Sequence, residues 1–125
     1  MNYVKLALQW GCQIFAGVIL IQEGLGKLQG TPGDIELFTE LSMEPGGRVI
    51  IGICELIAGV GLFHPLSAAF AAFLGAGVLT GAGLAHLGPL GFGETEMFIA
   101  TYASVLVVVI FRWSELPFAA SHRRR

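Results

Sequence analysis

Charged side chains are scarce in this sequence of 125 residues: Asp, Glu, Lys and Arg together make up only 13% of it. Soluble globular domains carry about 25% charged residues, whereas 54% of this chain is hydrophobic and its mean hydropathy is +0.74. A chain with so little charge cannot cover itself with a water-facing surface. The composition therefore favours a protein embedded in a membrane, and the length fits one domain comprising residues 1–125.

Cysteine is nearly absent as well. Cys12 and Cys54 each stand alone in apolar sequence, and no C-x-x-C motif occurs, so a redox dithiol or a zinc site lacks its usual support. We interpret both as packing residues and expect no metal site, because the histidines and carboxylates lack metal-ligand spacing. We also expect no nucleic-acid binding, since the one basic cluster, HRRR at 122–125, has no interleaved aromatic residues.

Long apolar runs take the place of charge. A helix that crosses a bilayer needs about 20 mostly apolar residues. His64-Pro65 interrupts the apolar sequence because proline cannot continue a helix, and GPLGFGETE at 88–96 is a turn signal. The first run has no small-x-small cleavage site, so we take it as a retained span. We predict an all-α fold, a four-transmembrane-helix bundle, with spans at about 4–28, 47–63, 66–87 and 97–113.

The basic residues predict how this bundle is oriented. Lys5, Arg112 and the terminal HRRR fall on one side, where we expect the arginines at the protein surface, whereas acidic residues fill the loop at 31–46 and the turn at 88–96. Both termini are therefore predicted to be cytoplasmic, in a multi-pass protein of the cell membrane. Within the acidic loop, ELFTEL at 36–41 carries its apolar residues on one helical face. We expect a short interfacial helix there that covers the outer end of the bundle.

The third predicted span is rich in small residues. Gly77 and Gly81 form a G-x-x-x-G pattern, and Ala68, Ala72 and Ala76 continue small residues at helical spacing. Such residues let helices approach closely in lipid. We favour tight packing inside the bundle, with a homo-oligomer formed through the Gly77–Gly81 face as the alternative.

Glu55 is the main polar candidate inside the predicted spans. It lies roughly 12 Å from the outer end of the second span at 1.5 Å per residue, and an ionised carboxylate near the bilayer centre costs on the order of 3 kcal/mol. Gly52 and Gly59 share its helical face, and Arg48 lies two turns away on that face. We therefore expect Glu55 to face the bundle, as part of a pocket wall.

Other polar residues fall near the same outer end. Glu23 and Lys27 stand four residues apart in the order that favours a helical ion pair, and we expect the pair to point into the bundle. His86 ends the third span and Tyr102 lies near the outer end of the fourth. The candidate ligand-binding or proton-relay residues are Glu23, Lys27, Arg48, Glu55, His86 and Tyr102. The alternatives are ion pairs that fix helix register, an interfacial hydrogen-bonding His86, and a Tyr102 in the interfacial aromatic belt.

Three of these stretches together resemble a known family. GLGKL at 24–28 resembles the G-x-x-K-L signature of the DoxX and DoxX-like membrane proteins, GICELIAGVGLFHP at 52–65 resembles their second span, and GAGLAHL at 81–87 is similar to the end of their third. The resemblance covers roughly residues 6–87. It implies a small four-helix membrane protein, with the family's lysine at Lys27 and its glutamate at Glu55. Some relatives are subunits of a thiosulfate:quinone oxidoreductase or belong to sulfur and oxidative-stress complexes, and more distant ones are assembly chaperones.

Three functions remain open from the sequence. The first is an accessory subunit of membrane redox chemistry, in which Lys27, Arg48 and His86 hold a quinone or a sulfur anion and Glu55 relays protons. No haem, flavin or iron–sulfur ligand set is evident, so electrons would come from a partner redox protein. The second is a structural or assembly-chaperone module without catalysis of its own. The third, less favoured, is a proton-coupled transporter, since the aromatic lining of small cation exporters is missing.

Overall fold

The computed structural model describes residues 3–87 and 96–116, and helices joined by turns are the only regular secondary structure in this part of the chain. Its elements are α1 (Tyr3–Gln29), α2 (Pro32–Glu40), α3 (Gly46–Gly61), α4 (Ala68–Leu87), α5 (Glu96–Phe111) and the 3₁₀ helix η1 (Trp113–Glu115). The predicted all-α fold is confirmed for these residues. Helices α1, α3, α4 and α5 coincide with the four predicted stretches to within two residues at each end. A short helix is also present in the acidic loop, as α2, where one was predicted over residues 36–41.

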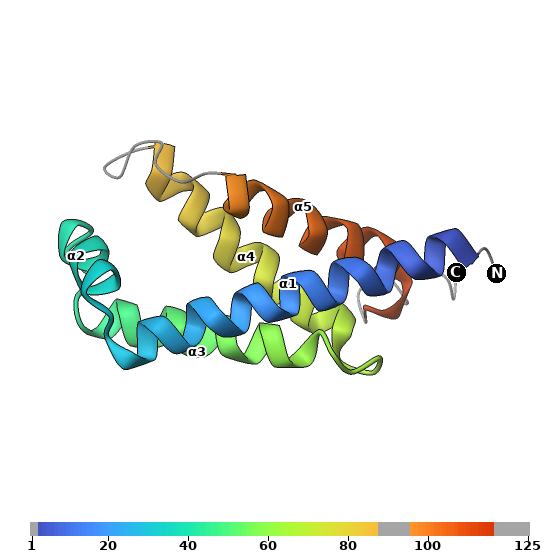
Figure 1. Ribbon diagram of the computed structural model, residues 1–125, viewed down its shortest axis with the longest axis horizontal. Helices are drawn as coiled ribbons and strands as arrows, with labels where there is room; N and C mark the ends of the chain where they lie inside the picture. The colour runs from blue at the N-terminus through green and yellow to red at the C-terminus, as the bar shows by residue number, and fades with distance from the viewer. Residues whose placement is uncertain (1–2, 88–95, 117–125) are drawn as a thin grey trace.

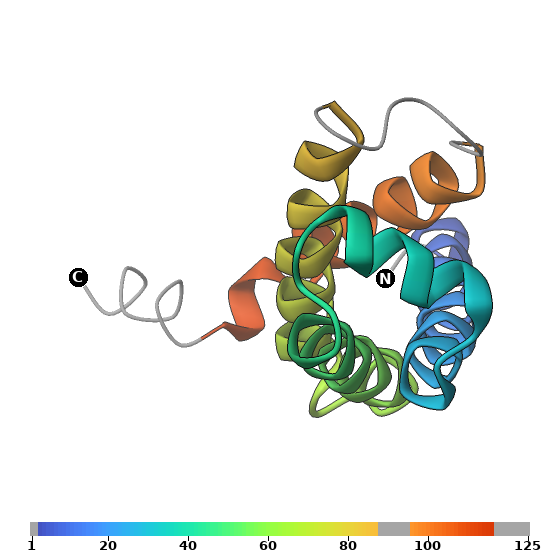
Figure 2. The ribbon, with the colours of Figure 1, turned by 90° about the vertical axis from the view of Figure 1, so that its left-hand side faces the viewer.

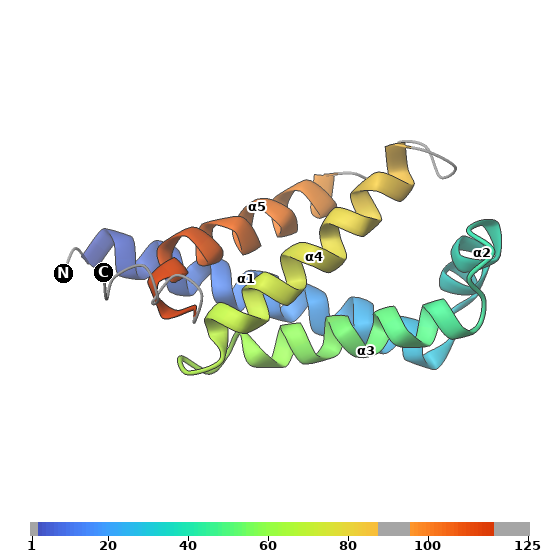
Figure 3. The ribbon, with the colours of Figure 1, turned by 180° about the vertical axis from the view of Figure 1, so that it is seen from behind.

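The helices form two pairs. Helix α3 runs antiparallel to the C-terminal part of α1, and their contact is the most extensive among the described residues; α4 and α5 lie side by side as a second pair, with α4 also packed on α3 and α5 on α1. The start of α1 and the end of α5 lie at one end of the bundle, and α2 lies at the opposite end (Figure 1). Seen along the bundle, α2 crosses this second end (Figure 2). Towards α2, α4 diverges from α3 (Figure 3).

Four glycines set the distance between α1 and α3. A Cβ atom added at Gly24 would lie 2.8 Å from the Gly52 carbonyl oxygen, and one at Gly59 would lie 2.9 Å from the Gly17 carbonyl oxygen. The two glycines of each helix are seven residues apart and so share one face. Backbone meets backbone at both crossings, which is how small residues bring helices together in lipid.

The G-x-x-x-G pattern of α4 has a different role from the one predicted. A Cβ atom at Gly77 or Gly81 would meet nothing within 4 Å, so the prediction that these glycines pack tightly inside the bundle is wrong. The buried face of α4 carries Ala68, Ala72 and Leu79 instead. Burial of these apolar side chains decides the rotation of α4 about its axis, and that rotation leaves the glycine pattern off the packed face.

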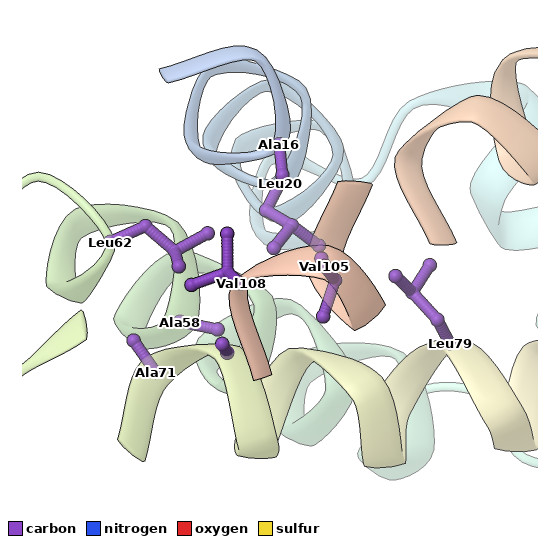
Figure 4. Close-up of a cluster of buried hydrophobic side chains, with 9 residues drawn as sticks. Ala16, Leu20, Ala58, Leu62, Ala71, Leu79, Val105 and Val108 are labelled. Carbon is purple, nitrogen blue, oxygen red and sulfur yellow. The ribbon is translucent and has the colours of Figure 1, made fainter. Parts of the chain in front are cut away.

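The hydrophobic core lies where the two helix pairs cross, in the middle of the bundle. Side chains from α1, α4, α5 and the C-terminal half of α3 meet there (Figure 4). The cluster comprises Ala16, Leu20, Ala58, Leu62, Ala71, Ala72, Leu79, Val105 and Val108. Six of these nine residues are alanine or valine, so the side chains in the core are small and the helices lie close together.

Large apolar side chains also cover the outside of the bundle. Every one of the four long helices exposes several of them, for example Val18, Ile57, Phe70 and Ile110. Exposed apolar surface on this scale marks an interaction surface or contact with a membrane. By length and composition, α1 is the one helix among the described residues suited to cross a membrane, while Ala68–Leu84 and Glu96–Phe111 are apolar but shorter.

Arg112 follows α5 and is only 7% exposed, so the prediction that it lies at the surface is wrong. Its Nε donates a hydrogen bond to Gln13 Oε1 at 2.8 Å, and its Nη1 donates to Glu115 at 3.0 Å. Gln13 Nε2 in turn donates to the Leu62 carbonyl oxygen at 2.9 Å. The guanidinium also lies 5.8 Å from the centre of the Trp10 ring. These contacts join α1, the α3–α4 turn and η1, and the buried polar groups at this junction explain why the arginine turns inward.

Replacement of Gln13 by leucine should lower the free energy of unfolding by about 1–3 kcal/mol, because the Leu62 carbonyl oxygen and Arg112 Nε each lose a buried hydrogen-bond partner. Gln22, which is exposed on the same helix, provides the matched control, since Gln22→Leu removes no buried hydrogen bond. Denaturant titration in mild detergent, followed by circular dichroism, measures both. Equal stability of the two variants would contradict a structural role for this cluster.

Candidate functional site

The C-terminal end of α1 contains the GLGKL motif (24–28), and Gly30 ends the helix two residues later. Gly30 has φ +71°, in the left-handed region that favours glycine. This geometry lets the Gly30 and Thr31 N–H groups donate to the carbonyl oxygens of Lys27 and Gly26, which closes the helix in a Schellman motif. Arg48 Nη1 donates to the same Lys27 carbonyl oxygen. The end of α1 is therefore held firmly, and with it the position of the Lys27 side chain.

Lys27 and Glu55 form a buried ion pair between α1 and α3. Lys27 Nζ lies 3.0 Å from Glu55 Oε2, and the two side chains are 10% and 7% exposed. The close approach of Gly24 to Gly52 brings the two backbones near enough for these side chains to meet. Glu23 Oε2 lies 3.6 Å from the same Nζ, but the Glu23 side chain is 59% exposed. Lys27 therefore has a buried partner on the neighbouring helix and a more exposed one on its own helix.

Glu55 Oε2 has an unusual environment for a buried oxygen. Its one polar partner among the residues that the structure describes is Lys27 Nζ, at 3.0 Å. Buried carboxylate oxygens normally accept hydrogen bonds. This oxygen therefore retains the capacity to accept a hydrogen bond at the wall of the cleft described next.

A cleft of about 830 Å³ lies between the two helix pairs at the end covered by α2. Its volume falls in the range of small-molecule sites, about 300–1,000 Å³. All five α-helices contribute to its walls, which are largely apolar and include Leu20, Phe38, Ile51, Leu79, Met97 and Phe98. Lys27 and Glu55 add polar groups to this apolar space. An apolar cavity with a few convergent polar groups is the usual form of a ligand-binding site.

The structure brings together three of the six predicted site residues: Glu23, Lys27 and Glu55 all line the cleft. Arg48 does not line it, because its Nε forms an ion pair with Glu44 at 2.9 Å while Nη1 binds the end of α1. Tyr102 is also elsewhere, with its hydroxyl 2.7 Å from Thr80 Oγ1 in a contact between α4 and α5. The side chain of the sixth residue, His86, lies outside the part of the chain that the structure describes.

Sequence reasoning identified some of the other cleft residues and missed others. The apolar face of the acidic loop was identified correctly, since Leu37, Phe38 and Leu41 line the cleft. The sequence did not indicate that Phe98 would join Phe38 there. Asp34 was counted only as an acidic loop residue, although it too lines the cleft. The turn between α1 and α2 brings Asp34 beside α1, and this turn was not predicted from the sequence.

The cleft carries an excess of negative charge. Among the described residues that line it, Glu23, Asp34 and Glu55 contribute carboxylates, whereas Lys27 contributes the one ammonium. Because like charges repel strongly where water is scarce, this arrangement disfavours an anionic ligand. With Arg48 turned away, the cleft suits a molecule that is neutral and largely apolar, with one or two atoms that exchange hydrogen bonds.

Comparison with known proteins gives one positive result. The DoxX family model matches residues 13–87. This segment extends from the first half of α1 to the end of α4, so it contains the Lys27–Glu55 pair and α2. No curated protein and no solved structure gives a significant match to the chain.

Proposed function

Because this chain belongs to the DoxX family of membrane proteins, we propose that α1, α3, α4 and α5 all cross the bilayer, with both termini in the cytoplasm. The apolar side chains exposed around the bundle support lipid contact on every side. With 16 residues, α3 is about 24 Å long, and a bilayer thins locally around short spans at modest cost. Lys5, at the start of α1, supports the cytoplasmic placement of that end.

In this orientation the cleft lies in the outer half of the membrane, and we propose that it binds a quinone. The observation that carries this proposal is the buried Lys27–Glu55 pair at the wall of an apolar cleft. A quinone has an apolar ring, no net charge and carbonyl oxygens that accept hydrogen bonds. The sulfur anion considered from the sequence is disfavoured by the surplus of carboxylates.

Lys27 is the residue that would bind the quinone oxygen. Its ammonium has three N–H donors, and two carboxylates lie beside it at 3.0 and 3.6 Å. At least one donor thus remains for a ligand oxygen. Glu55 holds the ammonium in place and is the nearest group to exchange a proton with a reduced quinone. In this proposal, the protein is an accessory subunit of membrane redox chemistry, and a partner redox protein supplies the electrons.

Extraction of bound molecules tests this proposal. The protein is purified in mild detergent from a quinone-containing membrane, and the extract is quantified by mass spectrometry. We expect quinone near one molecule per chain in the wild type and at least a tenfold decrease in Glu55→Gln. The amide keeps the shape of the side chain but removes the charge that positions Lys27, while Glu23 remains as a partner for the ammonium.

Glu115→Gln is the matched control, because Glu115 belongs to the ion pair with Arg112 at the other end of the bundle. It should retain quinone at the wild-type level. Wild-type protein that contains lipid but no quinone would refute the proposed function. Equal amounts of extracted quinone in Glu55→Gln and Glu115→Gln would show that the quinone does not bind at the Lys27–Glu55 pair.

A structural module is the second candidate, and one observation favours it. The Lys27–Glu55 pair joins α1 to α3 beside the Gly24–Gly52 crossing, where it would fix helix register without any ligand. In that case the extract would contain lipid alone and in equal amounts in all three proteins.

A further inference from the structure

Gly77 and Gly81 of α4 form part of the cleft wall, although they pack against nothing in the chain. Both line the cleft, both are exposed, and a Cβ atom at either would meet no atom within 4 Å. Gly77 lies in the middle of α4 and Gly81 one turn further along, and α4 diverges from α3 towards the α2 end (Figure 3). The cleft is therefore open along this stretch of α4, where bare backbone forms its surface.

The polar wall of the same cleft is also suited to a ligand. Glu55 is 5% exposed and lines the cleft, and the one polar partner of its Oε2 among the described residues is Lys27 Nζ at 3.0 Å, so this oxygen can accept a further hydrogen bond. The cleft thus combines a polar wall on α1 and α3 with an open, apolar wall on α4. A ligand that satisfies both walls has a polar head and an apolar extension.

We infer that Gly77 and Gly81 determine ligand specificity, by leaving a channel along α4 through which the apolar tail of the bound molecule reaches the lipid. The inference rests on the proposed quinone site and names its ligand class: a ring with hydrogen-bonding oxygens that carries a long hydrocarbon chain. The ring lies at Lys27, and the chain passes over the two glycines. Any larger residue at these positions would place its side chain where the hydrocarbon chain runs.

The chemistry of the wall suits this role. A glycine pair one helical turn apart leaves a shallow groove without Cβ atoms, and Val78 and Ala82 beside it are apolar. A hydrocarbon chain in such a groove makes van der Waals contact along its length. It also remains continuous with the bilayer, so that a chain longer than the cleft need not fold into it.

Binding measurements with two synthetic benzoquinones test this inference, one with a long alkyl tail and one without a tail. Each is titrated into purified protein in nanodiscs. We expect Gly81→Leu to weaken binding of the tailed quinone at least tenfold and to leave the tailless quinone within twofold of wild type. Gly81→Ala adds a single methyl group into open space and should give a smaller loss of the same kind.

Gly11→Leu is the matched control. Gly11 also has nothing within 4 Å of an added Cβ atom but lies in α1 outside the cleft, so both quinones should bind this variant as they bind wild type. Unchanged binding of the tailed quinone to Gly81→Leu would overturn the inference while the proposed function stands. A change in the oligomeric state of Gly81→Leu without a change in quinone binding would also overturn the inference, because the glycine pair would then be a contact between chains. Failure of wild type to bind either quinone would refute the proposed function and this inference with it.

Discussion

Replacement of Lys27 by methionine is expected to lower the free energy of unfolding by about 3–5 kcal/mol, the usual cost of removing one partner from a buried ion pair. The Glu55 side chain is 7% exposed and would lose the cation that lies 3.0 Å away, so its buried carboxyl group must either carry an uncompensated charge or bind a proton. Glu23 would remain on the same helix, but a second carboxylate only adds repulsion. Unfolding in mild detergent by titration with sodium dodecyl sulfate, followed by circular dichroism, provides the measurement.

Two further variants make this prediction specific. In Lys27→Met/Glu55→Leu both charges are absent, and buried pairs replaced by apolar residues of similar volume often leave proteins equally stable or more stable. We therefore expect the double variant to recover most of the loss. Lys5→Met is the control for removing a lysine, because Lys5 is exposed at the start of α1. A loss below about 1 kcal/mol for Lys27→Met, typical of a solvated pair, would show that water reaches the pair freely.

The double variant also separates stability from ligand binding. If it folds as well as wild type but contains no quinone, the pair serves the ligand. If it folds as well and retains quinone, the ligand is held elsewhere in the cleft, and the role of Lys27 proposed above fails.

Replacement of Gly59 by alanine is the second large effect we expect, a destabilisation of about 1–3 kcal/mol from overpacking. The added Cβ atom would lie 2.8 Å from Ile21 Cγ1 and 2.9 Å from the Gly17 carbonyl oxygen. The second of these is backbone, so relief requires α1 to move away from α3. Alanine gains up to about 1 kcal/mol over glycine in helix propensity, and the clash exceeds that gain.

Gly11→Ala provides the comparison, because an added Cβ atom there meets nothing within 4 Å. It should be as stable as wild type or slightly more stable, since only helix propensity changes. The same unfolding titration measures both variants. A Gly59→Ala protein with wild-type stability would mean that α1 and α3 are farther apart than the structure places them.

Much of the fold follows from local sequence. The four long apolar stretches, the break at His64-Pro65 and the apolar face of residues 36–41 predict the helices to within a few residues, because each depends on neighbours along the chain. Lys27 and Glu55 could be selected for a similar reason. A charge inside an apolar stretch is costly in a membrane wherever the helix lies, so it indicates a function or a partner without knowledge of the fold.

Tertiary structure decided which residues meet. Arg48 and Glu55 share a face of α3, yet the guanidinium of Arg48 binds Glu44 and the end of α1. Arg112 turns inward because Gln13, which itself donates to the Leu62 carbonyl oxygen, accepts a hydrogen bond from it across the fold.

The glycines show the same division between sequence and tertiary structure. Helical spacing places Gly77 and Gly81 on one face of α4, as it places Gly52 and Gly59 on one face of α3, and sequence alone cannot tell the two pairs apart. Their roles depend on how each helix is rotated about its axis. Burial of Ala72 and Leu79 sets that rotation for α4, and this sum of many weak contacts between helices is not encoded in any short stretch.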